Sequence, residues 1–191
     1  KGAVVMTLTT QGDAPIHYTL DGSEPTAASP RYTGPVEIGK STRFRATALR
    51  EGGENASYSR EFAFSKSTGR PAVLNTKPND SYTFEGASLL VDGYHSRPVF
   101  TSGAWLGYLD EPLDVTIDMG GDQSYRSVEL ETLAEKGDWI FPPSSVTVWV
   151  SDNGTDFTEV ASVTVPEAKA GDADGIGRYR MQFPETSARY L

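Results

Sequence analysis

Aromatic and hydrogen-bonding side chains gather in two loop-like stretches of the later part of the sequence. One stretch follows Asp92-Gly93 and continues through the Gly-punctuated segment SGAWLGY, and the other is KGDWIFPP. An aromatic ring can stack on the apolar face of a pyranose, while charged groups hydrogen-bond its hydroxyls. These residue types therefore favour a sugar-binding site. The candidate residues are Tyr94, His95, Arg97, Trp105, Tyr108 and Trp139.

Strand alternation predicts that the loops carrying Trp105 and Trp139 share one end of a β-sandwich. Strands are expected at 113–119 and 126–133, with a turn at 120–124 that sends the chain back to the first end. A tryptophan in a β-sandwich is also commonly packed, so either residue could instead be buried in the core or against a loop. Both alternatives stay open. Trp149 alternates within a further strand, where it could be exposed or packed.

Groups suited to catalysis are sparse. Asp110-Glu111 is an adjacent carboxylate pair, but it precedes Pro112 in a chain with 26 acidic residues, so a solvated turn is expected. His17 and His95 lie far apart in the sequence, and His17 is expected on the surface of a hairpin. The sequence has no phosphate-binding glycine loop, zinc-ligand spacing or nucleophile elbow. We therefore expect a chain without catalytic residues.

Charge and composition exclude several classes of partner. The chain has 191 residues and a formal net charge of −9, so it repels polyanions and is not expected to bind nucleic acid. No apolar run approaches the length of a membrane-spanning segment, so membrane insertion is not expected. Cysteine is absent, which excludes disulfides and thiolate metal sites.

Many short β-branched or aromatic runs, bounded by Gly, Pro, Asp or Ser, predict an all-β fold. In the segment Thr42–Leu49, the side chains of Phe44, Ala46 and Ala48 should face one way and the Arg and Thr side chains the other. A polar stretch with Gly and Pro, SKSTGRP, follows this first group of strands and predicts a domain boundary.

The run IHYTLDGSEPTAASPRYTGPVEI, Ile16 to Ile38, has a clear local pattern. Its alternation and its Asp21-Gly22 dipeptide predict a β-hairpin. The run resembles the small β-sandwich on the C-terminal side of bacterial β-N-acetylhexosaminidases and chitobiases. This resemblance covers about the first third of the chain and implies an accessory part of a carbohydrate-processing enzyme.

The later half resembles a second family through LLVDG, GAWLGY, DVTIDMGG and WIFPPSSVTVWVSDNGTDFTEV. Their order is similar to that of the factor V/VIII C-type, discoidin-like domain, a jelly-roll β-sandwich of the galactose-binding-like class. That resemblance implies further strands after Leu191 and a structural calcium ion with Asp92 as its carboxylate ligand. Asp92 could equally serve only the Asp-Gly turn. No other cofactor is required.

The two resemblances together imply two tandem β-sandwiches. The first, immunoglobulin-like sandwich is expected at 1–66, a linker at 67–72, and an incomplete discoidin-like jelly roll at 73–191. The implied function is a non-catalytic carbohydrate-binding or accessory region of a secreted, periplasmic or cell-surface bacterial β-N-acetylhexosaminidase. Its partners would be the catalytic domain of the parent chain and a glycan containing N-acetylhexosamine or galactose. The alternative is a structural spacer or protein-interaction module without sugar affinity.

Overall fold

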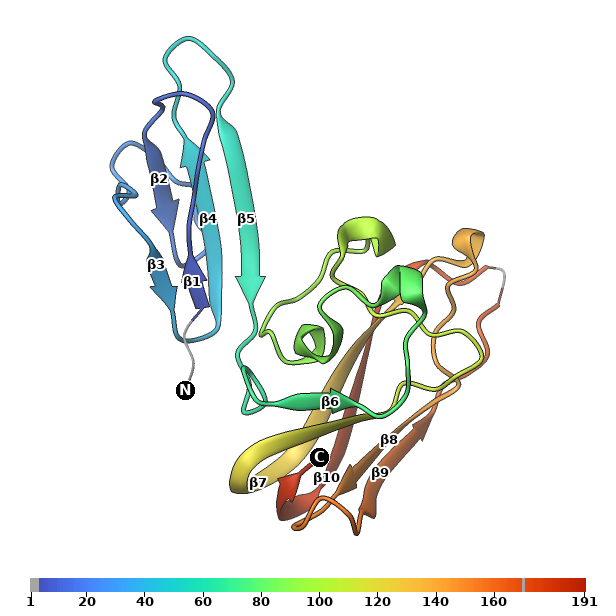
Figure 1. The fold of residues 1–191 in the computed structure, drawn as a ribbon. Helices are drawn as coiled ribbons and strands as arrows, with labels where there is room; N and C mark the ends of the chain where they lie inside the picture. The colour runs from blue at the N-terminus through green and yellow to red at the C-terminus, as the bar shows by residue number, and fades with distance from the viewer. Residues whose placement is uncertain (1–3, 170) are drawn as a thin grey trace. The chain divides into compact units, whose positions relative to one another are not determined.

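The chain folds from antiparallel β-strands and short 3-10 helices, which confirms the all-β expectation. The structure is a computed structural model that describes residues 4–169 and 171–191, and Figure 1 shows its course. None of the helices in these described residues is long and apolar enough to span a membrane. The strands are β1 (Val4–Met6), β2 (Ile16–Thr19), β3 (Val36–Ile38), β4 (Thr42–Ala48), β5 (Ala56–Phe62), β6 (Ala72–Leu74), β7 (Val115–Ala134), β8 (Ser145–Val150), β9 (Thr158–Thr164) and β10 (Gly175–Tyr190). The 3-10 helices are η1 (Asp80–Tyr82), η2 (Gly86–Leu90), η3 (Phe100–Ser102) and η4 (Lys136–Asp138).

The chain divides into two compact units. The first unit ends at Gly69 and also includes Asp92–His95, and the second consists of Arg70–Val91 and Ser96–Leu191. The division after Gly69 falls within the segment 67–72. Asp92–His95 lies in the later domain by sequence, but it packs within the first unit.

The first unit is a small sandwich of two sheets. β4 lies between β2 and β5 in one sheet, and β1 pairs with β3 in the other. On β4, Phe44, Ala46 and Ala48 are buried, as their alternation predicted. Phe44 and Ala46 pack with Ile38 of β3 and Phe62 of β5. Burial of each large apolar side chain contributes about 1.5–3 kcal/mol, so this shared core holds the two sheets together.

The predicted hairpin between Ile16 and Ile38 is right in its turn. β2 also pairs with the returning chain, through the antiparallel bridge of His17 and Arg31, but it does not pair with β3. Gly22 has a φ of 85°, and the Asp21 carboxylate accepts the Ser23 N–H at 2.9 Å, so the dipeptide does turn the chain. The strands on either side, β2 and β3, belong to different sheets, because β2 pairs with β4 and β3 pairs with β1. A local turn signal cannot specify such long-range pairing.

The second unit also has two sheets with a core between them. β7 lies between β6 and β10 in one sheet, and β8 pairs with β9 in the other (Figure 1). Alternate residues of β8 point inward, so Val148 and Val150 are buried while Trp149 is exposed. The two valines pack in one cluster with Met119 of β7 and Met181 of β10.

The two strands expected at 113–119 and 126–133 are one continuous strand. β7 bends (Figure 1) and contains Gly120, with a φ of 76°, and Gly121, with a φ of 150°. It stays paired with β10 on both sides of these glycines, through register shifts. The predicted turn between two separate strands is therefore wrong, and the alternation that placed the loops of Trp105 and Trp139 at one end no longer applies.

The last residues of the sequence, up to Tyr190, lie in β10. Tyr190 pairs with Asp118, and Leu191 exchanges backbone hydrogen bonds of 2.8 and 3.1 Å with Ile117. Tyr190 also forms an isolated bridge with Ser151, which follows β8. The end of β10 therefore joins the two sheets of the second unit.

Candidate functional site

The aromatic side chains of the loop after β7 are displayed to solvent. Trp139 follows η4 and is 85% exposed, and Phe141 is 54% exposed. Their ring centroids lie 6.4 Å apart with the planes at 79°, an edge-to-face contact. Large aromatic surface is costly to leave in water, so this pair is suited to stacking on the apolar face of a ligand. Phe141 belongs to the same aromatic stretch, KGDWIFPP, but it is not among the candidate residues of the predicted site.

Backbone and side-chain contacts hold this loop in a fixed shape. Glu135 and Ile140 exchange two backbone hydrogen bonds of 2.9 and 3.1 Å, which close the loop around η4. The Lys136 ammonium donates to the Asp172 carbonyl at 2.8 Å and pairs with the Asp174 carboxylate. The side-chain hydrogen bond from Lys136 is the main cause that holds the pKa of Asp174 below its ordinary value. These contacts therefore fix the ends of the loop, while the aromatic side chains at its tip are exposed to solvent.

The backbone of Trp139 is strained. Its φ is 60°, in the left-handed region that costs a residue with a side chain roughly 1–2 kcal/mol. Such strain persists where the surrounding structure enforces it, and it is concentrated at functional sites. The strained residue here is also the most exposed of the large apolar side chains that the structure describes.

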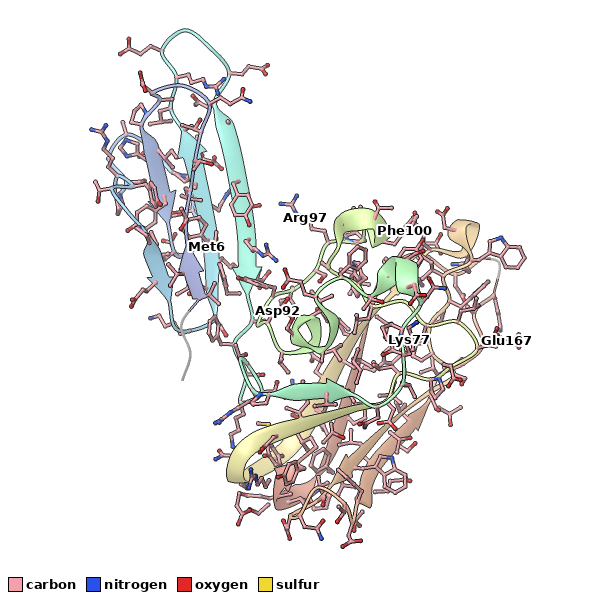
Figure 2. All side chains as sticks on the ribbon, in the orientation of Figure 1. Met6, Lys77, Asp92, Arg97, Phe100 and Glu167 are labelled. Carbon is pink, nitrogen blue, oxygen red and sulfur yellow. The ribbon has the colours of Figure 1, made fainter. Side chains whose placement is uncertain are left out.

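Arg97 and Trp105 contact each other within the second unit. The Trp105 indole Nε1 donates to the Arg97 carbonyl at 2.9 Å, and the neighbouring Ser96 hydroxyl donates to the Ala104 carbonyl at 3.2 Å. Trp105 is partly buried, whereas Arg97 is exposed on the loop before η3 (Figure 2). The indole N–H of Trp105 is thus used to hold the loop, and Arg97 is the accessible member of the two.

Tyr108 is partly buried. Its hydroxyl is enclosed, and burial is the main cause that raises its pKa. The adjacent Gly107 lies so close to Tyr82 that a β-carbon at position 107 would come within 2.8 Å of it. Tyr108 therefore lies in a tightly packed part of the loop region.

Asp92, Tyr94 and His95 lie in the first unit. The ring centroid of Tyr94 is 5.0 Å from that of Phe62, and the Arg60 guanidinium carbon lies 3.8 Å above the Tyr94 ring. The His95 N–H donates to the Glu61 carbonyl at 3.4 Å. Backbone pairing and packing thus occupy this segment, and its aromatic ring serves the core of the first unit.

The described residues do not supply a carboxylate-rich calcium shell around Asp92. The Asp92 carboxylate accepts the Tyr94 N–H at 2.8 Å, as expected of an Asp-Gly turn. Within the described ranges, no group of three or more His, Asp or Glu side chains is placed to hold a metal ion. A calcium site here would depend on backbone carbonyls beside Asp92, so the ion stays a prediction.

The adjacent carboxylates Asp110 and Glu111 occupy an exposed turn. Asp110 has a φ of 62°, and both residues are exposed. A left-handed residue is typical of a turn, and Asp tolerates this conformation better than most.

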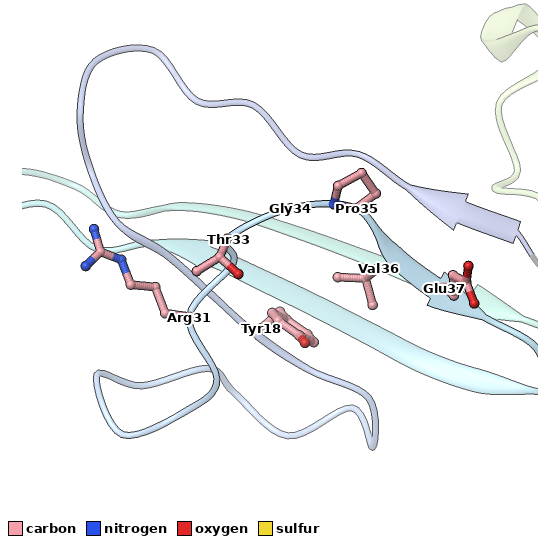
Figure 3. A pocket seen from close by; sticks show the side chains of 7 residues that line it. All are labelled: Tyr18, Arg31, Thr33, Gly34, Pro35, Val36 and Glu37. Atoms are coloured by element: carbon pink, nitrogen blue, oxygen red, sulfur yellow. The ribbon is translucent and has the colours of Figure 1, made fainter.

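The first unit contains hollows that the sequence did not indicate. One, of about 360 Å³, is lined by Tyr18 of β2 and by residues 31–37. Figure 3 shows Arg31 and Glu37 at its two ends with Tyr18 between them. One face of the Tyr18 ring stacks on Phe44 at a centroid distance of 5.8 Å, which connects this hollow to the core.

The comparisons with known proteins concern the first unit. Residues 1–60 match the family model of the chitobiase/beta-hexosaminidase C-terminal domain. None of the curated proteins compared with the chain matches it. The family match covers β1 to β4 and most of β5, so this part of the chain is similar to the C-terminal domain of hexosaminidases.

Proposed function

We propose that this chain is a non-catalytic accessory region of a secreted bacterial β-N-acetylhexosaminidase. The match of residues 1–60 to the hexosaminidase C-terminal domain carries this proposal. In that arrangement the catalytic domain of the parent chain is the intramolecular partner of the first unit. The greater part of the second unit belongs to a discoidin-like domain in this proposal, on the basis of its sequence motifs. Asp92, which packs in the first unit, would hold a structural calcium ion together with backbone carbonyls.

We further propose that the second unit binds glycan through the tip of the loop after β7. The exposed Trp139 and Phe141 support this, because an edge-to-face pair offers a flat ring for a pyranose and a second wall beside it. Arg97 is an exposed cation in the same unit whose guanidinium could donate to sugar hydroxyls. The alternative, a spacer without sugar affinity, is favoured by the burial of Tyr108 and the use of Trp105 and Tyr94 in packing.

The test compares two exposed tryptophans. Trp139→Ala should weaken binding of a glycan terminated by N-acetylglucosamine or galactose by about 1–3 kcal/mol, since the substitution deletes a stacked ring. Trp149→Ala is the matched control, because Trp149 is 46% exposed but lies on the face of β8. Calorimetric titration of both variants measures the difference.

Four outcomes would count against these proposals. Equal binding by the wild type and Trp139→Ala would remove the site from this loop. Loss of binding in Trp149→Ala alone would move the site to the β8-β9 sheet. No binding of either glycan by the wild type would leave the spacer, and hydrolysis of a chromogenic N-acetylglucosaminide that Asp110→Asn abolishes would overturn the non-catalytic role.

A further inference from the structure

The larger hollow of the first unit has a buried histidine in its lining. The hollow measures about 670 Å³ and lies between the loop at 11–15 and the residues that follow β4. This volume falls within the range of small-molecule sites. His17 lines it and is only 9% exposed, which contradicts the expected surface position on a hairpin.

The hydrogen bond of His17 fixes its tautomer. The Nδ1 atom lies 2.8 Å from the Ser29 carbonyl oxygen. A carbonyl oxygen only accepts, so Nδ1 carries the proton and donates it. In the neutral ring, Nε2 is then an acceptor with a free lone pair.

The Nε2 atom is not enclosed by the protein. His17 makes no other side-chain hydrogen bond to the described residues. The enclosed polar atoms that lack a partner among those residues are Tyr108 OH and Thr132 Oγ1, and Nε2 is not one of them. A histidine that is 9% exposed, lines a hollow and keeps one accessible ring nitrogen is placed to accept a hydrogen bond from a ligand.

The walls of the hollow are held in position. The Leu49 N–H donates to the Pro15 carbonyl at 3.0 Å, and the Arg50 guanidinium donates to the Gln11 carbonyl at 3.3 Å. These contacts tie the end of β4 to the loop before β2. These two contacts therefore hold the backbone on both sides of the hollow in place.

The lining combines apolar surface with polar groups, which matches a pyranose with its apolar face and its hydroxyls. Asp13 and Glu51 add carboxylate acceptors, and Gln11 and Arg50 add donors. Each sugar hydroxyl donates one hydrogen bond and accepts others, so it can satisfy such a mixed lining. A metal ion fits less well, because no group of three or more potential side-chain ligands is placed for one within the described residues.

We propose that this hollow is a second saccharide site, in which a sugar hydroxyl donates to His17 Nε2 while Asp13 or Glu51 accepts from a neighbouring hydroxyl. The site lies wholly in the first unit and does not depend on the loop of Trp139. It would give the accessory region one contact with glycan from each unit. Two weak sites on one chain raise the total affinity for a long glycan without any new contact.

The test uses nuclear magnetic resonance titration of the 191-residue chain with N-acetylglucosamine and with galactose at millimolar concentrations. At least one sugar should shift the amide signals of Asp13, His17 and Glu51 and the Nε2 signal of His17. His17→Asn should weaken binding about tenfold. The Asn amide can still donate to the Ser29 carbonyl, and its own acceptor, Oδ1, lies closer to the backbone than Nε2 does. This variant therefore removes the acceptor at the Nε2 position and retains the structural hydrogen bond.

Two further variants keep the proposal falsifiable if His17→Asn does not fold. Asp13→Asn and Glu51→Gln alter exposed side chains, and at least one of them should weaken binding several-fold. Wild-type binding by both would overturn the proposal. Glu37→Gln, in the other hollow of the same unit, is the matched control and should leave binding unchanged.

The proposed site at His17 and the proposed glycan site at Trp139 can be disproved independently of each other. Trp139→Ala should leave the shifts in the first unit unchanged. The absence of shifts around His17 with both sugars, wild-type binding by a folded His17→Asn variant, or a response of His17 to Zn²⁺ alone would overturn the saccharide site. None of these results would affect the proposed role of Trp139.

Discussion

Tyr94 and Trp139 are both aromatic residues in loops with polar neighbours, yet the structure uses them in opposite ways. Tyr94 lies against Phe62 and beneath the Arg60 guanidinium, whereas Trp139 is 85% exposed on a strained backbone. The difference arises because Tyr94 sits beside the end of β5, where backbone pairing brings it to a core. Trp139 lies in a loop closed on itself by Glu135 and Ile140. Composition alone does not distinguish a packing aromatic from a displayed one.

The largest expected effect tests the packing role of Tyr94. Tyr94→Ala should lower the free energy of unfolding of the first unit by about 2 kcal/mol, because it removes packing on Phe62 and the cation–π contact with Arg60. Trp139→Ala should change stability by less than about 0.5 kcal/mol, as for other exposed positions. Urea denaturation of both variants measures the contrast, and equal losses would refute it.

A smaller effect tests the strain at Trp139. Trp139→Gly should raise the free energy of unfolding by up to about 1 kcal/mol, because glycine adopts a φ of 60° without steric cost. The gain is limited, since glycine also increases the entropy of the unfolded chain. Thermal denaturation should compare this variant with Trp139→Ala, which keeps the β-carbon. The difference in their free energies of unfolding gives the cost of the left-handed backbone at position 139. A glycine variant less stable than the alanine variant would show that the backbone at this position is not strained.

The smallest effect concerns pH and the ion pair that joins β7 to β10. Arg189 donates to both carboxylate oxygens of Asp118, at 2.9 and 2.8 Å, and these hydrogen bonds lower the pKa of Asp118 from 3.8 to about 2. The folded state therefore binds this proton less readily than the unfolded state. The stabilisation is present above about pH 4 and is lost as the pH falls from about 4 to 2.

Asp118→Asn is the matched variant for this pH dependence. It should flatten the acid limb of the stability curve while the remaining carboxylates still titrate, and its effect near neutral pH should be small because the pair is partly exposed. Denaturation midpoints measured between pH 2 and pH 5 provide the comparison. Identical acid limbs in the variant and the wild type would exclude a contribution from this pair.

The sequence by itself determined the fold class and much of the local structure. The alternation of Phe44, Ala46 and Ala48 predicted which face of β4 is buried, because side chains alternate along a strand whatever lies beyond it. Asp21-Gly22 predicted a turn, since positive φ is a local property. The family resemblance of the first third was likewise carried by contiguous residues and is matched at residues 1–60.

Only the tertiary structure decided which strands pair and which candidate residues are accessible. β2 and β3 join different sheets, β7 continues through Gly120 and Gly121, and His17 is buried against Ser29 while lining a hollow. Each of these outcomes depends on contacts between segments far apart in sequence. Pairing and burial are cooperative properties of such contacts, whereas propensity and turn chemistry act over a few neighbouring residues.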